Sequence, residues 1–433
     1  MDYNDMNPQE KSERSQWGFL MGLITGTLVS LIIAGLLYAV FVPKEERQKE
    51  GREEDKEYEE EHHKAESKQT VEVISVFDDE MADKVEEIEE ILYELYYLGD
   101  IDKETMQDGM YKGMVDSLGD PYSVYYTEEE LNELMEQTYG VYYGIGAYVG
   151  LDTVTGYPKI ISPIEGAPAE EAGLRPDDII YEVEGVSTQG KDINSVVAMI
   201  KGEEGTKVRL TIVRSGESDY LYIDVERRRV ETPSVESEMF ENGMAYIQIT
   251  EFADTTVTQF AAALEEAESA GMKGLILDLR ANPGGSLASV VDIGRMLLPK
   301  GLIVYTEDKY GERAEYTCNG RNEFELPMVV LIDGNSASAS EVLAGAIRDY
   351  EIGVLVGTTT FGKGIVQQIV GLEDGSAIKV TVSSYYSPKG INIHGTGIEP
   401  DIVCEFDAEA YYGEENFDNQ LEFAKEVLAE MIQ

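Results

Sequence analysis

Three serines and one lysine are the residues of this chain whose types and spacing suit covalent chemistry. Ser336, Ser338 and Ser340 alternate with alanine directly after the apolar run Met328 to Ile332 and an Asp-Gly-Asn turn. That pattern predicts a buried strand, a sharp turn and a helix that begins near the serines. Unpaired backbone N–H groups and the helix dipole stabilise negative charge at a helix start. The segment therefore places small hydroxyl side chains where an anion is stabilised.

A serine becomes a nucleophile when a neighbouring base takes its proton, and histidine is the usual base. Two of the three histidines lie in a charged run, and only His394 belongs to a region expected to fold. Lys363 is the remaining candidate, because burial among apolar neighbours lowers the pKa of an amine. Those neighbours are Phe361, Ile365 and Val366. These residues alone leave two interpretations open, a Ser-Lys dyad or helix-capping serines beside a surface lysine.

Three sequence blocks resemble the active-site blocks of the carboxy-terminal processing peptidases, also called tail-specific proteases. They are DLRANPGG at 278–285, SASASE at 336–341 and FGKGIVQ at 361–367, and they occur in that family's order along the chain. The resemblance implies that Ser338 is the nucleophile of a serine endopeptidase and that Lys363, 25 residues later, is its base. It implies no cofactor.

The same resemblance implies that Gln367 orients the lysine and that the backbone N–H groups of Ala339 and Gly284 form the oxyanion hole. A glycine suits that role because a residue without a Cβ lets the backbone approach a reacting carbonyl. Side chains four residues apart meet on a helix but are separated by roughly 13 Å along a strand. We therefore predict a helical turn from Lys363 to Gln367 if these two side chains touch.

A phosphate-binding P-loop is a competing interpretation of the same region. Gly357 to Lys363 matches G-x-x-x-x-G-K after an apparent strand, and residues 275–278 resemble an acidic metal-binding strand. However, Gly364 stands where the Mg²⁺-binding hydroxyl belongs. The alternating residues 377–385 also favour strands over the long helix that a P-loop needs. Nucleotide hydrolysis is therefore the weaker alternative.

Composition excludes several classes of partner. The formal net charge of −51 speaks against nucleic acid, because nucleic-acid binding depends on clustered Lys and Arg. Cys318 and Cys404 form neither a metal-ligand spacing nor a disulfide framework, and whether they pair is left open. No group of His, Cys or carboxylate residues has the spacing of a metal site, so we expect none.

The amino-terminal segments indicate a membrane protein. Residues 1–17 form a polar tail, and residues 18–42 contain no charge. Twenty-five helical residues span about 37 Å, which is enough to cross a bilayer. The run is too long for a signal peptide and lacks a small-x-small cleavage pattern, so we expect one uncleaved transmembrane helix. Residues 43–70 form a charged linker with little to bury.

Orientation in the membrane is less directly encoded. More basic residues follow the apolar run than precede it, and a count of these charges alone would keep the long part in the cytoplasm. Long following domains often translocate regardless of flanking charge. Members of the resembled family act outside the cytoplasm, so we expect a single-pass protein of the cell membrane with an extracytoplasmic catalytic domain.

Residues 71–137 form an expected helical amino-terminal domain, since apolar residues recur there at helical spacing. The block LGDPYS at 118–123 resembles a block at the same place in the same peptidases. Their amino-terminal helices commonly form a dimer contact, so we expect a homodimer. An intramolecular helical cap remains the alternative.

Residues 138–228 resemble a bacterial PDZ domain. The similarity lies in YGIG at 143–146, GAPA at 166–169 and AGLRPDDII at 172–180, although Asp177 replaces the usual glycine. Aspartate tolerates a left-handed backbone, so the turn remains possible.

The resemblance and the physics of peptide capture together predict the PDZ site. N–H groups of the loop Gly144, Ile145 and Gly146 would receive a peptide's terminal carboxylate, and the strand from Ala147 to Val149 would offer it a sheet edge. A helix over 193–200 would line the groove. Its lining residues would be Val197 and Ile200.

Residues 229–433 form the expected serine peptidase core. Strands are predicted at 244–249 and 274–279, a helix at 256–270 and a closing helix at 418–432. Such alternation implies an α/β core with its site at the strand ends, and the resemblance makes that core crotonase-like. His394 lies between further blocks of the family, which assigns it no catalytic part.

The sequence therefore predicts a multidomain α/β protein, a membrane-anchored serine endopeptidase. Its PDZ domain would recognise the free carboxyl-terminal tails of protein or peptide substrates, and its core would hydrolyse them by a Ser-Lys mechanism. A catalytically silent PDZ scaffold and the P-loop nucleotide hydrolase are the two alternatives. The physiological substrate and the activating signal are not encoded in any motif.

Overall fold

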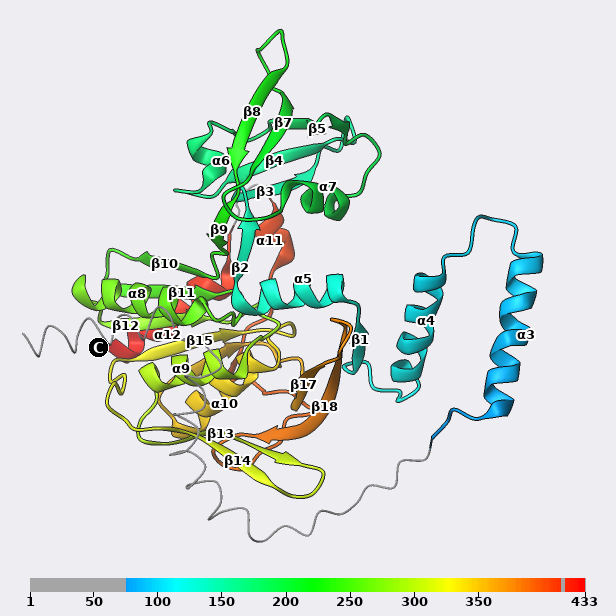
Figure 1. Cartoon of the computed structure of the whole chain (residues 1–433). Coiled ribbons are helices and arrows are strands. Elements are labelled where there is room, and N and C mark those ends of the chain that lie inside the picture. The colour runs from blue at the N-terminus through cyan, green and yellow to red at the C-terminus, as the bar shows by residue number, and fades with distance from the viewer. Residues whose placement is uncertain (1–74, 414–416, 433) are drawn as a thin grey trace, which may run out of the picture. The chain divides into compact units, whose positions relative to one another are not determined.

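The structure is a computed structural model that describes residues 75–413 and 417–432. The chain divides into two compact units, residues 1–99 and 100–433. The described part of the first unit contains the helix α3 (Asp79–Leu95), none of whose residues is buried (Figure 1). Asp78 caps this helix, because its carboxylate accepts a hydrogen bond from the Met81 N–H at 2.8 Å.

The predicted transmembrane helix and charged linker, residues 18–42 and 43–70, lie outside the described residues, as does the tail at 1–17. Among the helices that the structure describes, none combines the length and the apolar character needed to cross a bilayer.

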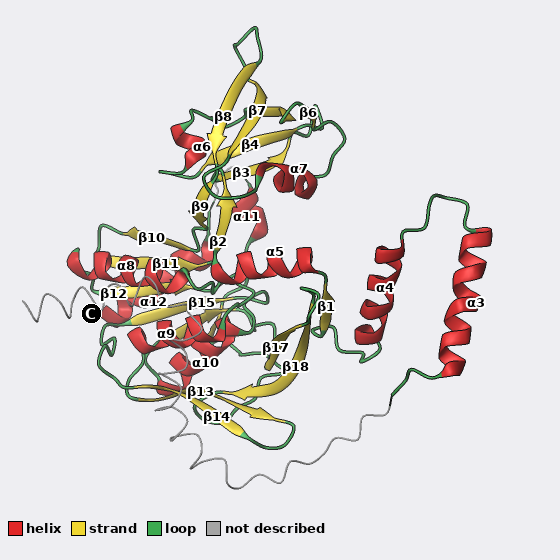
Figure 2. Cartoon of the chain, in the orientation of Figure 1, coloured by secondary structure: helices red, strands yellow, loops and turns green. Residues whose placement is uncertain are grey.

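A six-stranded sheet forms the centre of the α/β core that was expected over residues 229–433 (Figure 2). Its strand order is β10-β11-β12-β15-β16-β19, and all neighbours are parallel except the antiparallel pair β10 and β11. The strands are β10 (Val235–Met239), β11 (Met244–Ile249), β12 (Gly274–Asp278), β15 (Met328–Ile332), β16 (Val354–Gly357) and β19 (Ile402–Val403). Every residue of β12 and β15 is buried, as expected for parallel strands that are covered on both faces.

Helices cover both faces of this sheet. One face carries α8 (Thr256–Ser269), α9 (Leu287–Leu297) and α10 (Ala339–Tyr350), and the other carries α12 (Asn419–Ile432). Leu275 and Leu277 belong to the first apolar core, and Ile276 belongs to the second. Successive residues of a strand point to opposite faces, so the unbroken apolar run of β12 supplies both cores.

A second, antiparallel sheet lies in the same core and is organised around the long strand β18 (Ala377–Tyr386). Its other strands are β1 (Val124–Tyr126), β13 (Gly301–Asp308), β14 (Arg313–Cys318) and β17 (Ile365–Gly371). The helical region expected over 71–137 contains α3, α4 (Lys103–Asp116) and α5 (Glu128–Tyr139). It also contains β1, which helical periodicity did not indicate and which pairs with β18.

The PDZ-like region has its own sheet, ordered β3-β4-β5-β7-β8, with β6 paired to β5. The strands are β3 (Ala147–Leu151), β4 (Pro158–Pro163), β5 (Ile179–Val183), β6 (Val186–Ser187), β7 (Lys207–Val213) and β8 (Leu221–Glu226). Helices α6 (Pro168–Glu171) and α7 (Ile193–Ile200) accompany it, and β2 (Val141–Gly144) and β9 (Arg228–Glu231) form a separate ribbon. Asp177 has a φ of 66°, so it takes the left-handed turn expected of it. The remaining helix is α11 (Ala408–Tyr412).

The helical turn from Lys363 to Gln367, which was predicted on the condition that these two side chains touch, does not form, and Gln367 bonds to Thr381 instead. Strand β17 begins at Ile365, and its backbone pairs with β18 from Ile365 opposite Ser384 onward. A helix there would leave this edge of β18 without its hydrogen-bond partners, so pairing with β18 overrides the local geometry. The same strand contradicts a P-loop, which requires a helix directly after the lysine.

Candidate active site

The turn between β15 and α10 carries the three serines and separates their roles. Ser336 and Ser340 are buried, and their hydroxyls donate to the backbone oxygens of Leu279 and Asn282 at 2.8 and 2.9 Å. These two serines therefore hold the turn against the neighbouring strand end. Ser338 is partly exposed, with a φ of 54° and a ψ of −111°, an unusual conformation for a residue with a side chain. A strand-to-helix turn of this kind presents a serine hydroxyl outward.

The turn after β12 lies directly against Ser338. Gly284 has a φ of 105°, and a Cβ on it would lie 2.7 Å from the Ala337 oxygen and 2.8 Å from the Ser338 Cβ. No residue except glycine fits there without displacing the serine turn. The buried Asn282 amide donates to the Ile249 oxygen at 2.8 Å and so holds this turn to β11.

The two backbone N–H groups expected to form the oxyanion hole differ in whether they already have a hydrogen-bond acceptor. Ala339 is the first residue of α10, so its N–H is among those that have no acceptor within the helix. The N–H of Gly284, in contrast, donates to the Asn282 side-chain oxygen at 2.8 Å. In this arrangement the Gly284 N–H is engaged, and it must leave Asn282 before it can donate to an oxyanion.

The carboxylate of Glu341 joins the serine turn to the lysine loop. One of its oxygens accepts from the backbone N–H groups of Ser338 and Lys363, each at 2.8 Å. The other accepts from the Gly362 N–H at 2.7 Å and from the Thr360 hydroxyl at 2.5 Å. Glu341 is only 1% exposed, so these four donors satisfy a carboxylate that water hardly reaches. It sets the spacing between the two residues expected to react.

One cleft brings together all the residues that the sequence assigned to catalysis. It is lined by Ser338, Ala339, Gly284, Lys363 and Gln367. Apolar side chains line other parts of the same cleft, among them Leu287, Val342 and Val366. The hydroxyl of Tyr385, another lining residue, donates to the backbone carbonyl oxygen of Ser338 at 3.0 Å. An extended peptide entering this cleft would meet apolar surface beside the hydroxyl and the amine.

The Lys363 amine lies in surroundings that disfavour its charged form. Burial lowers its pKa, and the positive charge of Lys379 lowers it further, whereas Asp120 and Glu341 act in the opposite direction. The net direction is a pKa below the ordinary lysine value. The expected neighbour Phe361 does not contribute this burial, because it is 56% exposed.

The Lys363 Nζ lies 4.8 Å from the centre of the Tyr122 ring. Within the part of the chain that the structure describes, no hydrogen bond joins this nitrogen to the Ser338 hydroxyl. Gln367 also lines the cleft, but its side-chain nitrogen donates to the Thr381 hydroxyl at 3.3 Å and not to Lys363. The pairing of β17 with β18 shifts between Val366, opposite Ser383, and Gln367, opposite Thr381, so β18 contains one extra residue at this point.

The residues predicted for peptide capture lie in the PDZ-like region. Gly144 ends β2, Gly146 precedes the edge strand β3, and α7 contacts β3. Ile145 and Ile200 are 2% and 4% exposed and belong to the apolar core, so Ile200 does not line an open groove as expected. Val197 is partly exposed.

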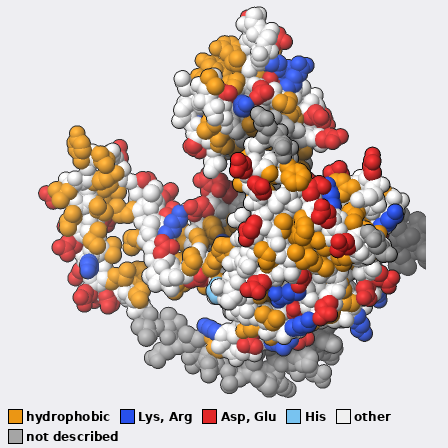
Figure 3. Space-filling view, turned by 180° about the vertical axis from the view of Figure 1, so that it is seen from behind, with side chains coloured by type: hydrophobic (Ala, Val, Ile, Leu, Met, Phe, Trp, Pro, Cys, Tyr) orange, Lys and Arg blue, Asp and Glu red, His pale blue; other side chains and the backbone are white. Residues whose placement is uncertain are grey.

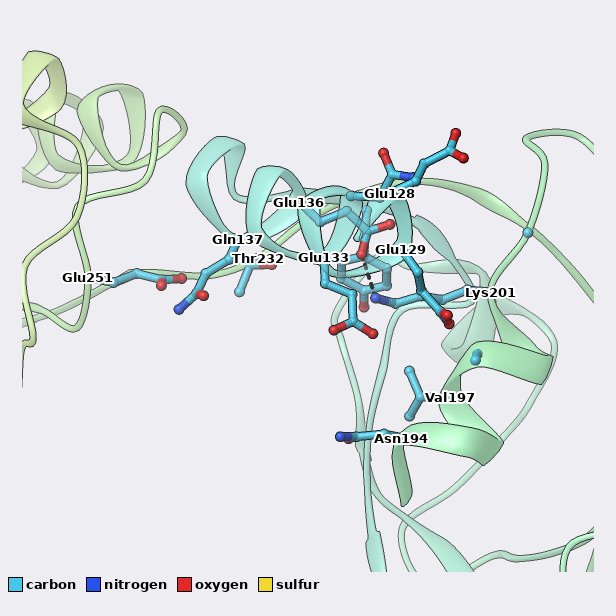
Figure 4. A pocket seen from close by; sticks show the side chains of 14 residues that line it. Glu128, Glu129, Glu133, Glu136, Gln137, Asn194, Val197, Lys201, Thr232 and Glu251 are labelled. Carbon is cyan, nitrogen blue, oxygen red and sulfur yellow. Dashed lines mark hydrogen bonds and ion pairs between the residues drawn. The ribbon is translucent and has the colours of Figure 1, made fainter. Parts of the chain in front are cut away.

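Val197 also lines a second pocket, between α7 and α5 (Figure 4). Glutamates of α5 occupy one side of it, including Glu133 and Glu136. Lys201 follows α7 and forms an ion pair with Glu136 at 2.5 Å. The pocket is therefore acidic on the α5 side, with one lysine paired across it.

Sequence reasoning missed four residues of the site. Glu341 stands three residues after Ser338, at the spacing of a capping box, which is a signal that was available. Lys379 and Tyr385 line the cleft because β18 carries them, and the pairing of β1 with β18 brings Tyr122 to the Lys363 amine. That is a long-range arrangement without a local signature.

Comparison with known families gives three matches. The pattern of peptidase family S41 matches residues 243–404, which contain Gly284, Ser338 and Lys363. The pattern of the PDZ domain matches residues 159–214. That of the "Activating protease CtpB N-terminal domain" matches residues 31–130.

Several curated proteins are similar over most of the chain. The carboxy-terminal processing protease CtpA of Bacillus subtilis is 38% identical, covering 73% of this chain and 67% of that protein. CtpB of the same organism is 37% identical over 76% and 68%, and the carboxyl-terminal-processing protease of Synechocystis is 37% identical over 67% and 69%.

The α/β core, the PDZ domain and these similarities together define a serine peptidase. The chain belongs to peptidase family S41, among the carboxy-terminal processing proteases.

Proposed function

We propose that this chain is a membrane-anchored endopeptidase in which Ser338 is the nucleophile and Lys363 is its general base. The observation that carries the proposal is the single cleft that both side chains line, with their backbone N–H groups bound to the same oxygen of Glu341. A half-buried lysine whose pKa is lowered is neutral more often than an ordinary lysine, so it is better suited to act as a general base.

The reaction requires the neutral amine of Lys363 to reach the Ser338 hydroxyl. The amine takes the hydroxyl proton while Oγ attacks the peptide carbonyl, and the N–H of Ala339 stabilises the resulting oxyanion. The Lys363 ammonium then gives its proton to the leaving amine, which leaves an acyl ester on Ser338. Water attacks that ester while Lys363 takes a proton from it, and the Lys363 ammonium then gives this proton to the Ser338 Oγ as the carboxylic acid product leaves.

Substitution of the two residues tests this mechanism. We expect Ser338→Ala and Lys363→Ala each to reduce kcat for a peptide with an apolar carboxyl end by about a thousandfold or more. Binding of the peptide should persist, because the PDZ region is intact in both variants. Lys309→Ala and Ser218→Ala, at exposed positions, are the matched controls. Cleavage by Lys363→Ala at the wild-type rate would disprove the dyad.

We further propose that the PDZ domain captures the free carboxyl terminus of a protein or peptide substrate. The support is the loop of Gly144, Ile145 and Gly146 beside β3, an edge strand with an unpaired side that a peptide can extend. Amidation of the terminus removes the negative charge that this loop would bind. We expect the amidated peptide to bind at least tenfold more weakly, measured by fluorescence anisotropy with Ser338→Ala. Equal affinity for both forms would contradict this proposal.

The remaining proposals concern location and assembly. Residues 18–42 support a single-pass anchor, and the family resemblance supports an extracytoplasmic catalytic domain with a crotonase-like core. Exposed apolar residues on α3, Ile88, Ile91 and Leu95, support a homodimer formed by the amino-terminal helices (Figure 3).

The membrane anchor is tested by truncation. Removal of residues 1–43 should release the protein from the membrane fraction without loss of peptidase activity. Retention in that fraction would contradict the anchor.

A further inference from the structure

The loop between α4 and β1 is brought to the cleft by strand pairing. Strand β1 pairs with β18 with Val124 opposite Lys379, and the N–H of Thr381 donates to the Ser123 hydroxyl at 3.1 Å. Ser123, buried, donates in turn to the Asp120 carboxylate at 2.6 Å. The other oxygen of Asp120 accepts from the backbone N–H of Tyr122 at 3.0 Å. These bonds fix the loop that carries Tyr122 to the strand that lines the cleft.

Tyr122 presents its ring to the amine of Lys363, with 4.8 Å between Nζ and the ring centre. An aromatic face at this distance attracts an ammonium ion and has little attraction for a neutral amine. The Ser338 hydroxyl has no hydrogen bond to that amine among the described residues, although both line the same cleft. The ring therefore stabilises the protonated form of a lysine that is not in position to act as a base, and it does so against the burial that lowers the pKa of this amine.

Several charged groups from other elements share this environment. Asp120 and Glu341 favour the ammonium form and Lys379 disfavours it. The cleft also contains Glu251, and His394 packs beside Gly364 and close enough to Asp120 to influence it. All of these groups are unchanged when only the ring of Tyr122 is replaced, so its contribution can be measured separately.

We propose that Tyr122 is a positioning residue that holds the protonated Lys363 in a resting place away from Ser338. This inference rests on the proposed Ser-Lys mechanism. Catalysis then requires the amine to leave the ring, lose its proton and turn to the hydroxyl. Occupation of the cleft by a substrate is the event that would displace it. The ring thus limits the fraction of molecules that are ready to react.

The pH dependence of kcat/KM tests the role of the ring. Removal of a partner that stabilises the ammonium lowers the pKa of Lys363, so the acidic limb of the profile should move to lower pH. We expect Tyr122→Leu to shift this limb to lower pH by about half a unit. At a fixed pH on the acidic side of the profile, kcat/KM should therefore be about threefold higher than in the wild type. Tyr122→Phe keeps the aromatic face and should restore the wild-type limb. Tyr310→Leu removes the ring beneath Lys309, which lies at 5.0 Å on the surface, and serves as the matched control.

A second measurement separates this inference from the peptidase mechanism. In the Ser338→Ala background, NMR titration of labelled lysine with and without Tyr122→Leu reports the pKa of Lys363 in the absence of catalysis. A lowered pKa supports the resting contact even if the Ser-Lys mechanism fails. An unchanged pKa, an unchanged limb, or equal shifts in the Leu and Phe variants would overturn the inference. If Tyr122→Leu does not fold, Tyr122→Met gives the same comparison with a flexible apolar side chain.

Discussion

At the scale of single residues, the site depends on a carboxylate that takes no part in the proposed chemistry. Glu341 is buried and accepts four hydrogen bonds from the serine turn and the lysine loop. A charged acceptor is worth more than a neutral one to each donor that it binds. Ser338 and Lys363 are thus placed by backbone bonds, which leaves their side chains free to react.

The charge of Lys379 gives a residue-scale prediction about pH. Because that charge lowers the pKa of Lys363, Lys379→Met should raise this pKa and move the acidic limb of kcat/KM to higher pH. We expect a shift of up to about one pH unit, since a full unit corresponds to about 1.4 kcal/mol between protonation states. Activity at neutral pH should fall accordingly. Lys379→Arg keeps the charge and is the control, and coincident profiles for the two variants would show that the charge is unimportant.

At the scale of elements, two turns meet at the carboxyl ends of β12 and β15, where a parallel α/β sheet places its site. The first turn contributes Gly284 and the second contributes Ser338. Their contact explains why glycine is needed at one position of the DLRANPGG block. The positive φ of Gly284 and the absence of a Cβ are both required there.

Replacement of this glycine gives the element-scale prediction. Gly284→Ala forces a Cβ against the Ala337 oxygen and the Ser338 Cβ, so the serine turn must move. We expect kcat to fall by at least about a hundredfold, since a displacement of roughly 1 Å in the reacting groups has that effect. Gly113→Ala in α4, where a new Cβ meets nothing within 4 Å, should leave kcat unchanged and stabilise the helix. Wild-type activity of Gly284→Ala would contradict this account of the turn.

At the scale of the whole peptidase core, a buried ionic network joins the sheet to the last helix. Arg280 binds Asp278 at 2.6 Å and Asp418 at 2.8 Å, and the Tyr246 hydroxyl donates to Asp278 at 2.9 Å. Asp278 is fully buried, so the removal of its charge leaves Arg280 short of a partner. This network holds the start of α12 against the strand that leads into the Gly284 turn.

An Asp→Asn pair tests the network. Asp278→Asn should lower the free energy of unfolding by about 3–5 kcal/mol, the usual cost of breaking a buried ion pair. Asp292→Asn breaks an exposed pair with Arg295 and should cost less than about 1 kcal/mol. Urea denaturation followed by intrinsic fluorescence measures both. Equal effects of the two substitutions would indicate that the network does not stabilise the core.

Long elements were predictable from the sequence because their signals are local. Strands β11 and β15 and helix α7 have the predicted bounds, and α8 and α12 differ from them by one residue at one end. An apolar run or a helical periodicity of this length predicts the type of element, because the residues that form the pattern are the same ones that become buried. The left-handed turn at Asp177 followed from its residue type in the same way.

The contacts of the site were not predictable, because they join residues that are distant in sequence. The sequence by itself determined the α/β class, the PDZ region and the candidates Ser338 and Lys363, since residue types and spacing carry that information. Only the tertiary structure decided that Lys363 precedes a strand, that Tyr122 lies beside its amine and that Glu341 joins the two loops. The physical reason is that pairing with β18 and burial of a carboxylate depend on which segments meet, and no local pattern records that.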